Sequence, residues 1–419
     1  MNSFKSLHWT EKLEIISLTA MLMLLPIDSG ASLVSACVWM CVVVLKNTLL
    51  KRWSFFSWHQ DKNYHYSKNY YFLIPMACYW AMYLVSMLWT ENRMSGWNEV
   101  AQLIWFILLP LICFCTDFRQ ISAKEIRLML WIYVVTLSVL FVLSLGNVFV
   151  QLSRTPDQSF LWYMILHDFY YIHHSYMALY ILAGLAFLYS ELVREKHIEI
   201  RQWIGIIVCA CCLLLFLVCI NSRAGLLCLL FMLVLCWGHL CFVSKKYRFA
   251  LISLALVLLT VVVAHFTLPE HFRRLSVTIE QIAQGDKSDG RFEIMENAWS
   301  VVKDNMLFGV GAGDRMDELV PYYGSLEDVY CPHNQYLDTW MATGVAGLTV
   351  LLIMLLWPFI KAWKKQLIFP FLLLLMLMVS LLFESMLERQ MGVSFTGVIY
   401  VFMVLIFNVE SIDNKCVKL

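Results

Sequence analysis

Long apolar runs separated by short polar stretches dominate the chain. A run of about 17–25 apolar residues is long enough to cross a bilayer as a helix. The pattern predicts an all-α integral membrane protein with about twelve transmembrane helices, at residues 13–27, 30–50, 70–89, 100–116, 127–150, 172–190, 202–220, 223–243, 248–268, 336–360, 367–384 and 393–410.

One long polar interval, residues 269–335, interrupts this series. We expect one membrane domain in three parts: residues 1–268 with helices one to nine, a large loop over 269–335, and residues 336–419 with the last three helices. Within the loop, Asp289-Gly290 predicts a helix start. The apolar residues that follow recur at helical spacing and predict an amphipathic helix lying on the membrane: Phe292, Met295, Ala298, Trp299 and Val302. The glycine-rich stretch GVGAG comes after a helix, not a strand, and therefore indicates a flexible turn more than a nucleotide site.

Composition agrees with this interpretation. Hydrophobic residues make up 61% of the 419 positions and charged residues only 15%, whereas a soluble domain has about a quarter charged residues. The formal net charge of +1 does not indicate a partner. Most of the 14 cysteines lie inside apolar runs, which is typical of small buried side chains and not of a disulfide framework.

The basic residues predict the orientation. With the N-terminus inside, the inner segments hold 21 of the 31 lysines and arginines, and the large loop lies outside. The remaining ten are eight arginines and two lysines, whereas lysine prevails inside. Orientation needs only positive charge, but arginine presents a planar fork that binds phosphate bidentately. The skew therefore indicates an anion site on the outer side.

Three residues on that side are candidates for chemistry. Arg223 lies in a turn almost too short to leave the membrane, where a charge is costly unless it is paired or faces water; the alternative is an arginine that reaches the headgroups. Arg291 is in the first turn of the loop helix, where backbone N–H groups favour anions, or else on a solvated face. His333, at the mouth of an apolar helix, is a natural general base. Nearby arginines would disfavour its protonated form, and no set of metal ligands surrounds it in the sequence.

Three further residues are possible supporting groups. His174 begins a predicted helix on the same side as Arg291, although a histidine at an interface is commonly just solvated. Glu388 and Arg389 lie in the last outer loop, where either side chain would be able to orient a partner.

These residues resemble those of a known family. His333-Asn334, nine residues and then Gly344-Val345-Ala346-Gly347 resemble the H-[NSQ]-x9-G-x-x-G signature of the O-antigen ligase and O-antigen polymerase superfamily. Asp289-Gly290-Arg291, followed by a helix and FGVGAG, is similar to the start of that family's large periplasmic loop. Ser222-Arg223-Ala224-Gly225 is similar to its SRxG turn, and His174-Ser175-Tyr176 to its HSY element.

The resemblance implies a GT-C-like membrane fold and an inverting, metal-independent glycosyltransferase of the bacterial inner membrane, with its active site facing the periplasm. The donor would be a glycan linked to undecaprenyl pyrophosphate, held by Arg223 and Arg291. His333 would take the proton of the acceptor hydroxyl, with no metal and no cofactor. A ligase acceptor would be lipid A-core or another glycan, and a polymerase acceptor a second lipid-linked repeat.

Other functions stay open at this stage. A protein-directed oligosaccharyltransferase is a third type of member of the superfamily. From another class, a transporter or flippase is the rival, because about twelve helices is common there; such proteins bind substrates at mid-membrane through broken helices and buried charges. Besides glycans, membrane lipid is the expected partner, and nucleic acid is not.

Overall fold

The structure is a computed structural model of the whole chain. It describes residues 7–50, 70–116, 118, 120–154, 172–194, 199–220, 222–243, 291–323 and 331–412, and a few positions between 245 and 262. The described residues form helices and no strands. In chain order the elements are α2 (Trp9–Leu24), α3 (Ser29–Leu49), the 3-10 helix η3 (Tyr71–Leu73), α4 (Ile74–Ser86), α5 (Arg93–Gln102), α6 (Trp105–Cys115), α7 (Ala123–Arg154), α9 (His174–Arg194), α10 (Ile200–Cys219), α11 (Arg223–Gly238), the π-helix η5 (His239–Val243), α14 (Arg291–Asp304), the 3-10 helix η6 (Asp317–Leu319), α15 (Val320–Tyr323), α16 (Gln335–Lys364), α17 (Ile368–Ser380), the 3-10 helix η8 (Met386–Glu388) and α18 (Gln390–Ile412).

Eight helical stretches in the described part of the chain are long and apolar enough to cross a membrane, and η3 with α4, and α17, are shorter apolar helices. The protein is a multi-pass membrane protein. The first predicted span corresponds to α2, which has 16 residues, and most of the predicted span 248–268 lies outside the described residues. The total of twelve and the GT-C-like architecture therefore stay predictions.

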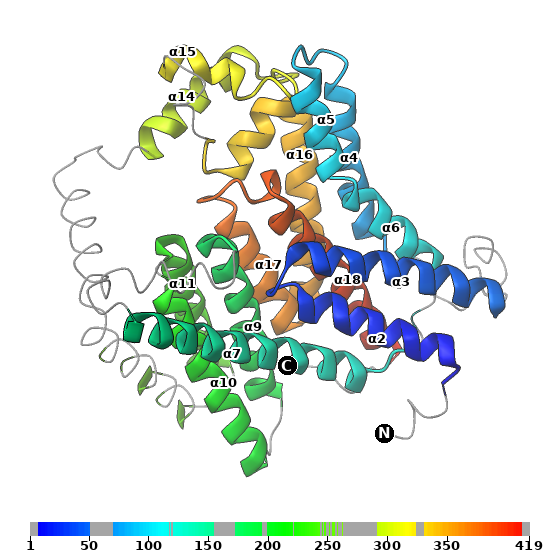
Figure 1. Cartoon of the computed structure of the whole chain (residues 1–419), viewed down its shortest axis with the longest axis vertical. Coiled ribbons are helices and arrows are strands. Elements are labelled where there is room, and N and C mark those ends of the chain that lie inside the picture. Colours follow the sequence, from blue (N-terminus) through cyan, green and yellow to red (C-terminus); the bar gives the residue numbers. More distant parts are fainter. Residues whose placement is uncertain are drawn as a thin grey trace.

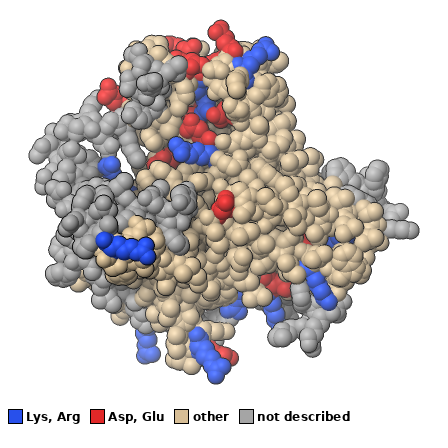
Figure 2. All heavy atoms as spheres, in the orientation of Figure 1, with Lys and Arg blue, Asp and Glu red and all other residues tan. Residues whose placement is uncertain are grey.

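Charged side chains gather at two opposite ends of the molecule. Figure 2 shows acidic and basic groups at the upper edge, near α5, α14 and α15 of Figure 1, and mainly basic groups along the lower edge. The face between them is mostly uncharged. This distribution is that of a protein whose middle is surrounded by lipid.

The helix α16 consists of two segments. Gly344 has φ 68° and ψ −167°, so residues 335–343 and 345–364 are separate helical pieces that meet at a sharp bend. This backbone conformation is open to glycine and strained for other residues. A Cβ atom at Gly344 would also lie 2.1 Å from the carbonyl oxygen of Leu307. Gly344 therefore breaks the helix and lets the backbone at Leu307 approach closely.

A backbone strap, residues 305–315, closes over this bend. The N–H groups of Val310 and Gly311 donate to the carbonyls of Met341 and Ala342 at 2.7 and 3.1 Å, and the N–H of Val345 donates to the carbonyl of Met306 at 2.9 Å. Backbone groups freed by a helix break must find partners in an apolar setting, and the strap supplies them. The GVGAG stretch is thus part of a turn, as expected, and these hydrogen bonds hold it against α16.

The amphipathic helix predicted in the large loop is α14. Its apolar side packs on protein: Ala298, Val301 and Val302 are buried with Met341 of α16, and the Trp299 and Trp340 rings lie 5.5 Å apart. The prediction that this side lies on the membrane is wrong, because the first segment of α16 covers it.

A buried arginine secures the end of the strap. The Arg315 side chain donates from Nη2 to Oε1 of Glu99 at 2.7 Å and from Nη1 to Asp338. Burial lowers the pKa of Arg315, but the carboxylates of Asp338 and Glu99 raise this pKa by a larger amount. The pKa of Arg315 is therefore above its usual range, and the group stays charged. Since a broken buried ion pair is costly, this cluster joins α5, the strap and the first segment of α16.

Candidate functional site

Four helix ends meet on the side of the molecule that carries the strap. The N–H of Gln335, at the start of α16, donates to the carbonyl of Leu381, just after α17, at 2.9 Å. Ser380 of α17 lies 3.6 Å from Cys228 of α11, measured between Oγ and Sγ. The start of α11 also packs closely on α9, because a Cβ atom at Gly225 would lie 2.5 Å from Cβ of Ala178. The N-termini of α9, α11 and α16 thus surround the C-terminus of α17.

His333 lies at this meeting point, immediately before α16. It has φ 49°, in the left-handed region that few residues other than glycine adopt, and strained residues of this kind cluster at functional sites. Asn334 caps the helix, because its side-chain oxygen accepts from the N–H groups of Tyr336 and Leu337 at 3.0 and 3.1 Å. The imidazole is 26% exposed, so it is held by protein and still accessible.

A buried carboxylate holds the imidazole. Nδ1 of His333 lies 3.1 Å from Oε2 of Glu384, and Oγ of Ser175, in the first turn of α9, donates to the other carboxylate oxygen at 2.9 Å. Residues from α9, from the loop before α16 and from the loop after α17 therefore form one hydrogen-bonded chain. Because the carboxylate is 9% exposed, its contact with the imidazole is poorly screened by solvent.

This arrangement assigns the two ring nitrogens. A carboxylate accepts hydrogen bonds, so in the neutral histidine Nδ1 carries the proton and Nε2 is left as the acceptor. The same carboxylate would stabilise an imidazolium if Nε2 took a proton, as in other carboxylate–histidine pairs. The geometry suits a general base whose ring is oriented by the hydrogen bond between Nδ1 and Glu384.

Gln335 connects this pair to the buried ion cluster. Its side-chain oxygen accepts from the N–H of Leu387 at 2.6 Å, and its amide nitrogen donates to Asp338 at 3.4 Å and to Thr339 at 3.3 Å. The loop that contains Glu384 is thereby fixed relative to α16. The distance between the imidazole and the carboxylate is thus controlled from both sides.

The predicted arginines differ in what the structure describes. Arg223 is exposed and begins α11, whose N-cap Ser222 accepts from the N–H of Gly225 at 3.1 Å. It therefore lies at the meeting point of the helix ends, where helix dipoles favour an anion. Arg291 begins α14 as predicted, but its side chain lies outside the described residues.

The possible supporting residues surround this site. His174 begins α9, and its ring lies 3.9 Å from that of His173. Glu388 ends η8, and Arg389 is exposed just after it. The carboxylate that contacts His333 is Glu384, one helical turn before Glu388 in the sequence. Burial, with a smaller effect of Glu388, raises the pKa of Cys331 to about 12, so this thiol is protonated and a poor nucleophile at neutral pH.

No group of three or more histidine, cysteine or acidic side chains suited to a metal ion occurs in the described part of the chain.

Comparison with known protein families gives one match, to part of the chain. The model of one protein family, O-antigen ligase, matches residues 207–352. This part of the chain is therefore similar to O-antigen ligases. The resemblance noted in the sequence is confirmed over this range, which contains Arg223, Arg291 and His333. No curated protein matches the chain.

The O-antigen ligase match leaves out two residues of the site. Ser175 and Glu384 lie on either side of residues 207–352. Glu384 contacts the imidazole of His333, and Ser175 donates to Glu384. In the sequence, Ser175 belongs to the HSY element, and Glu384 is in none of the motifs that predict the site. The signal that was available is a second carboxylate in the last outer loop, four residues before Glu388.

Proposed function

We propose that this O-antigen ligase-like protein transfers a glycan from a lipid-linked pyrophosphate donor to an acceptor hydroxyl, on the outer side of the bacterial inner membrane. The family match supports membrane glycan transfer. The observation that carries the finer proposal is the His333–Glu384 hydrogen bond, located where α11 begins with Arg223. His333 is suited to deprotonate the acceptor, and Arg223 is suited to bind the leaving pyrophosphate.

In this mechanism a single displacement inverts the anomeric carbon. Nε2 of His333 takes the proton of the acceptor hydroxyl as its oxygen forms the new bond to that carbon. The bond between the carbon and the pyrophosphate oxygen breaks, and the pyrophosphate leaves with the electron pair. Arg223, Arg291 and the helix N-termini stabilise this negative charge. Pyrophosphate is a good leaving group, so positioning and one base suffice.

The rival transporter function has one feature in its favour, the broken helix α16 with charges beside it. In transporters such breaks expose backbone groups to the substrate. Here the strap already occupies them, through Val310, Gly311 and Met306. The charges nearby are also paired with one another, Arg315 with Glu99 and Asp338. The break is thus filled by protein, and glycan transfer is the function that fits better.

Purified His333→Ala protein tests the mechanism. We expect glycan transfer to be slower by roughly 10²–10⁴-fold, the usual contribution of a positioned base, while binding of the lipid-linked donor largely survives. Glu384→Gln should lower the rate less, because the amide still accepts from Nδ1 but stabilises the imidazolium poorly. Addition of EDTA should leave the wild-type rate unchanged.

Two outcomes contradict the mechanism. Loss of donor binding together with turnover in His333→Ala would make this histidine a binding residue, and His174→Ala would then test the next candidate base. An activity that EDTA stops and Mg²⁺ restores would indicate that a metal ion assists the departure of the pyrophosphate. The acceptor is determined in the same assay: transfer to lipid A-core supports a ligase, and extension of a second lipid-linked repeat supports a polymerase.

A further inference from the structure

At the end of the molecule opposite His333, the helices line a partly open polar cavity. It has a volume of about 370 Å³, lies between α7, α9 and α10, and is lined by Lys124, Arg127, Trp131, Glu191 and Gln202 together with two aliphatic residues. Since α9 has Ser175 near its start and Glu191 near its end, the two sites are about 24 Å apart at 1.5 Å per residue. The cavity is thus separate from the catalytic site.

The charges around this cavity favour an anion. Glu191 is buried, and it accepts from Nε of Arg127 and from the indole N–H of Trp131, the latter at 3.1 Å. Nε of Arg194 lies 3.7 Å from its other oxygen. One carboxylate therefore faces two arginines, and the exposed Lys124 adds a further positive charge to the lining.

A second observation points to a missing polar ligand atom. Oε1 of Gln202 is buried and has no hydrogen-bond partner among the residues that the structure describes. Gln202 lines the same cavity. Buried side-chain amides are normally satisfied, and an amide that turns over presents its NH₂ group instead. A phosphate in the cavity would accept a hydrogen bond from the NH₂ group of the turned Gln202 amide.

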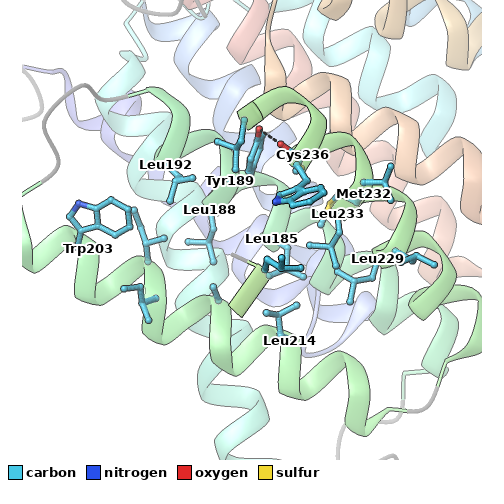
Figure 3. Close-up of a pocket in the computed structure, with 18 residues that line it drawn as sticks. Leu185, Leu188, Tyr189, Leu192, Trp203, Leu214, Leu229, Met232, Leu233 and Cys236 are labelled. Carbon is cyan, nitrogen blue, oxygen red and sulfur yellow. Dashed lines mark hydrogen bonds between the residues drawn. The ribbon is translucent and has the colours of Figure 1, made fainter. Parts of the chain in front are cut away.

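An apolar cavity of about 310 Å³ adjoins the polar one, and Ile206 lines both. Figure 3 shows Leu188, Leu214 and Leu233 around it, from α9, α10 and α11. Its lining is almost entirely carbon, with Trp203 at one end of the view. Hydrocarbon is the ligand that such a lining binds.

We propose that these two cavities bind one anionic phospholipid of the inner leaflet, with its phosphate beside Lys124 and Arg127 and an acyl chain in the apolar cavity. Basic pockets between transmembrane helices on the cytoplasmic side bind anionic headgroups, and arginine suits phosphate oxygens. The assignment to the inner leaflet rests on the predicted orientation and does not depend on glycan transfer. The lipid would join α7 to α9 and α10 and so stabilise the bundle.

The full-length protein in a neutral detergent tests this proposal through its thermal unfolding midpoint. Dioleoyl phosphatidylglycerol should raise the midpoint and saturate, whereas dioleoyl phosphatidylcholine and inorganic phosphate should not. In Lys124→Gln the lipid concentration for half the effect should rise roughly five-fold, which corresponds to about 1 kcal/mol for one basic residue at an anionic lipid. Arg201→Gln is the matched control, because Arg201 is exposed in the first turn of α10 and does not line the cavity; its response should equal that of the wild type.

Each other outcome overturns a part of the proposal. An equal rise with phosphatidylcholine would show a hydrocarbon site without an anion site, and an equal rise with inorganic phosphate a site for free phosphate. An equal rise in the half-effect lipid concentration for Lys124→Gln and Arg201→Gln would show that the lipid responds to the general surface charge and not to this cavity. A second variant, Ala210→Phe, fills the apolar cavity from α10; an unchanged response to dioleoyl phosphatidylglycerol would place the acyl chain elsewhere.

Discussion

At the scale of single residues, the site separates two tasks that the chemistry requires. The ring of His333 is held by Glu384, which accepts in turn from Ser175, and the imidazole is suited to move a proton. Arg223, at a helix start, is suited to hold negative charge. A base and an anion-binding group must differ in this way, because a cation in contact with the base would compete with the proton that it takes.

The first prediction at this scale concerns the shape of the cation. Arg223→Lys keeps the charge but replaces a planar fork by a point charge. We expect glycan transfer to be slower by roughly 10-fold to 100-fold, since one donor to the leaving group is lost, and the same result for Arg291→Lys. The measurement is the initial rate of transfer at equal protein level.

Arg93→Lys is the control for this pair of variants. Arg93 is also exposed, begins α5 on the same side as Arg223 and makes no contact with His333. Its rate should equal that of the wild type. Wild-type rates in both Arg223→Lys and Arg291→Lys would contradict the assignment of the pyrophosphate site.

At the scale of elements, the spacing between His333-Asn334 and Gly344 has a structural counterpart. The nine residues between His333-Asn334 and Gly344 are the first segment of α16, and Gly344 ends it. The segment has the base at one end and, at the other, a bend filled by the strap. The length of this segment therefore sets where the strap and α14 lie relative to the imidazole.

We predict that Gly344→Ala destabilises the protein. The substitution adds a Cβ atom 2.1 Å from the carbonyl oxygen of Leu307 at a residue with φ 68°, and strain and overpacking together cost roughly 2–4 kcal/mol. The measurement is the thermal unfolding midpoint in detergent, which should fall. Gly146→Ala in α7, where an added Cβ meets nothing within 4 Å, should leave the midpoint unchanged or raise it slightly. Equal midpoints for the two variants would exclude a special role of the bend.

At the scale of the whole molecule, the helix ends sort into two groups. The starts of α9, α11 and α16 and the end of α17 meet at the site, and the sequence places all of them outside. The polar cavity is lined by the start of α7, the end of α9 and the start of α10. The sequence places these three helix ends inside. The packing thus agrees with one alternating path of the chain through the bilayer.

Cysteine labelling tests the orientation directly. Glu318→Cys, exposed beside α15, should react with a membrane-impermeant maleimide in cells whose outer membrane alone is permeable. Arg201→Cys, exposed at the start of α10, should react only after the inner membrane is opened. The unsubstituted chain, with its 14 cysteines, gives the background. The reverse pattern would invert the topology and with it the proposed mechanism.

The sequence by itself determined the class of the protein and most of its helices, and it supplied three candidate residues for the proposed site. Apolar runs must be helical in lipid because no water satisfies their backbone groups, so the pattern alone predicts spans such as α7 and α9. The motifs around Arg223, Arg291 and His333 were sufficient for the family, because each is a short local stretch of sequence.

Only the tertiary structure decided the contacts between distant parts of the chain. Ser175, His333 and Glu384 are far apart in sequence, and packing of α9, α16 and α17 brings them together. The bend at Gly344 and the burial of α14 likewise depend on the strap, whose hydrogen bonds to α16 have no signal in local periodicity. Hydrophobic pattern specifies which face of a helix is buried; it does not specify which neighbour covers that face.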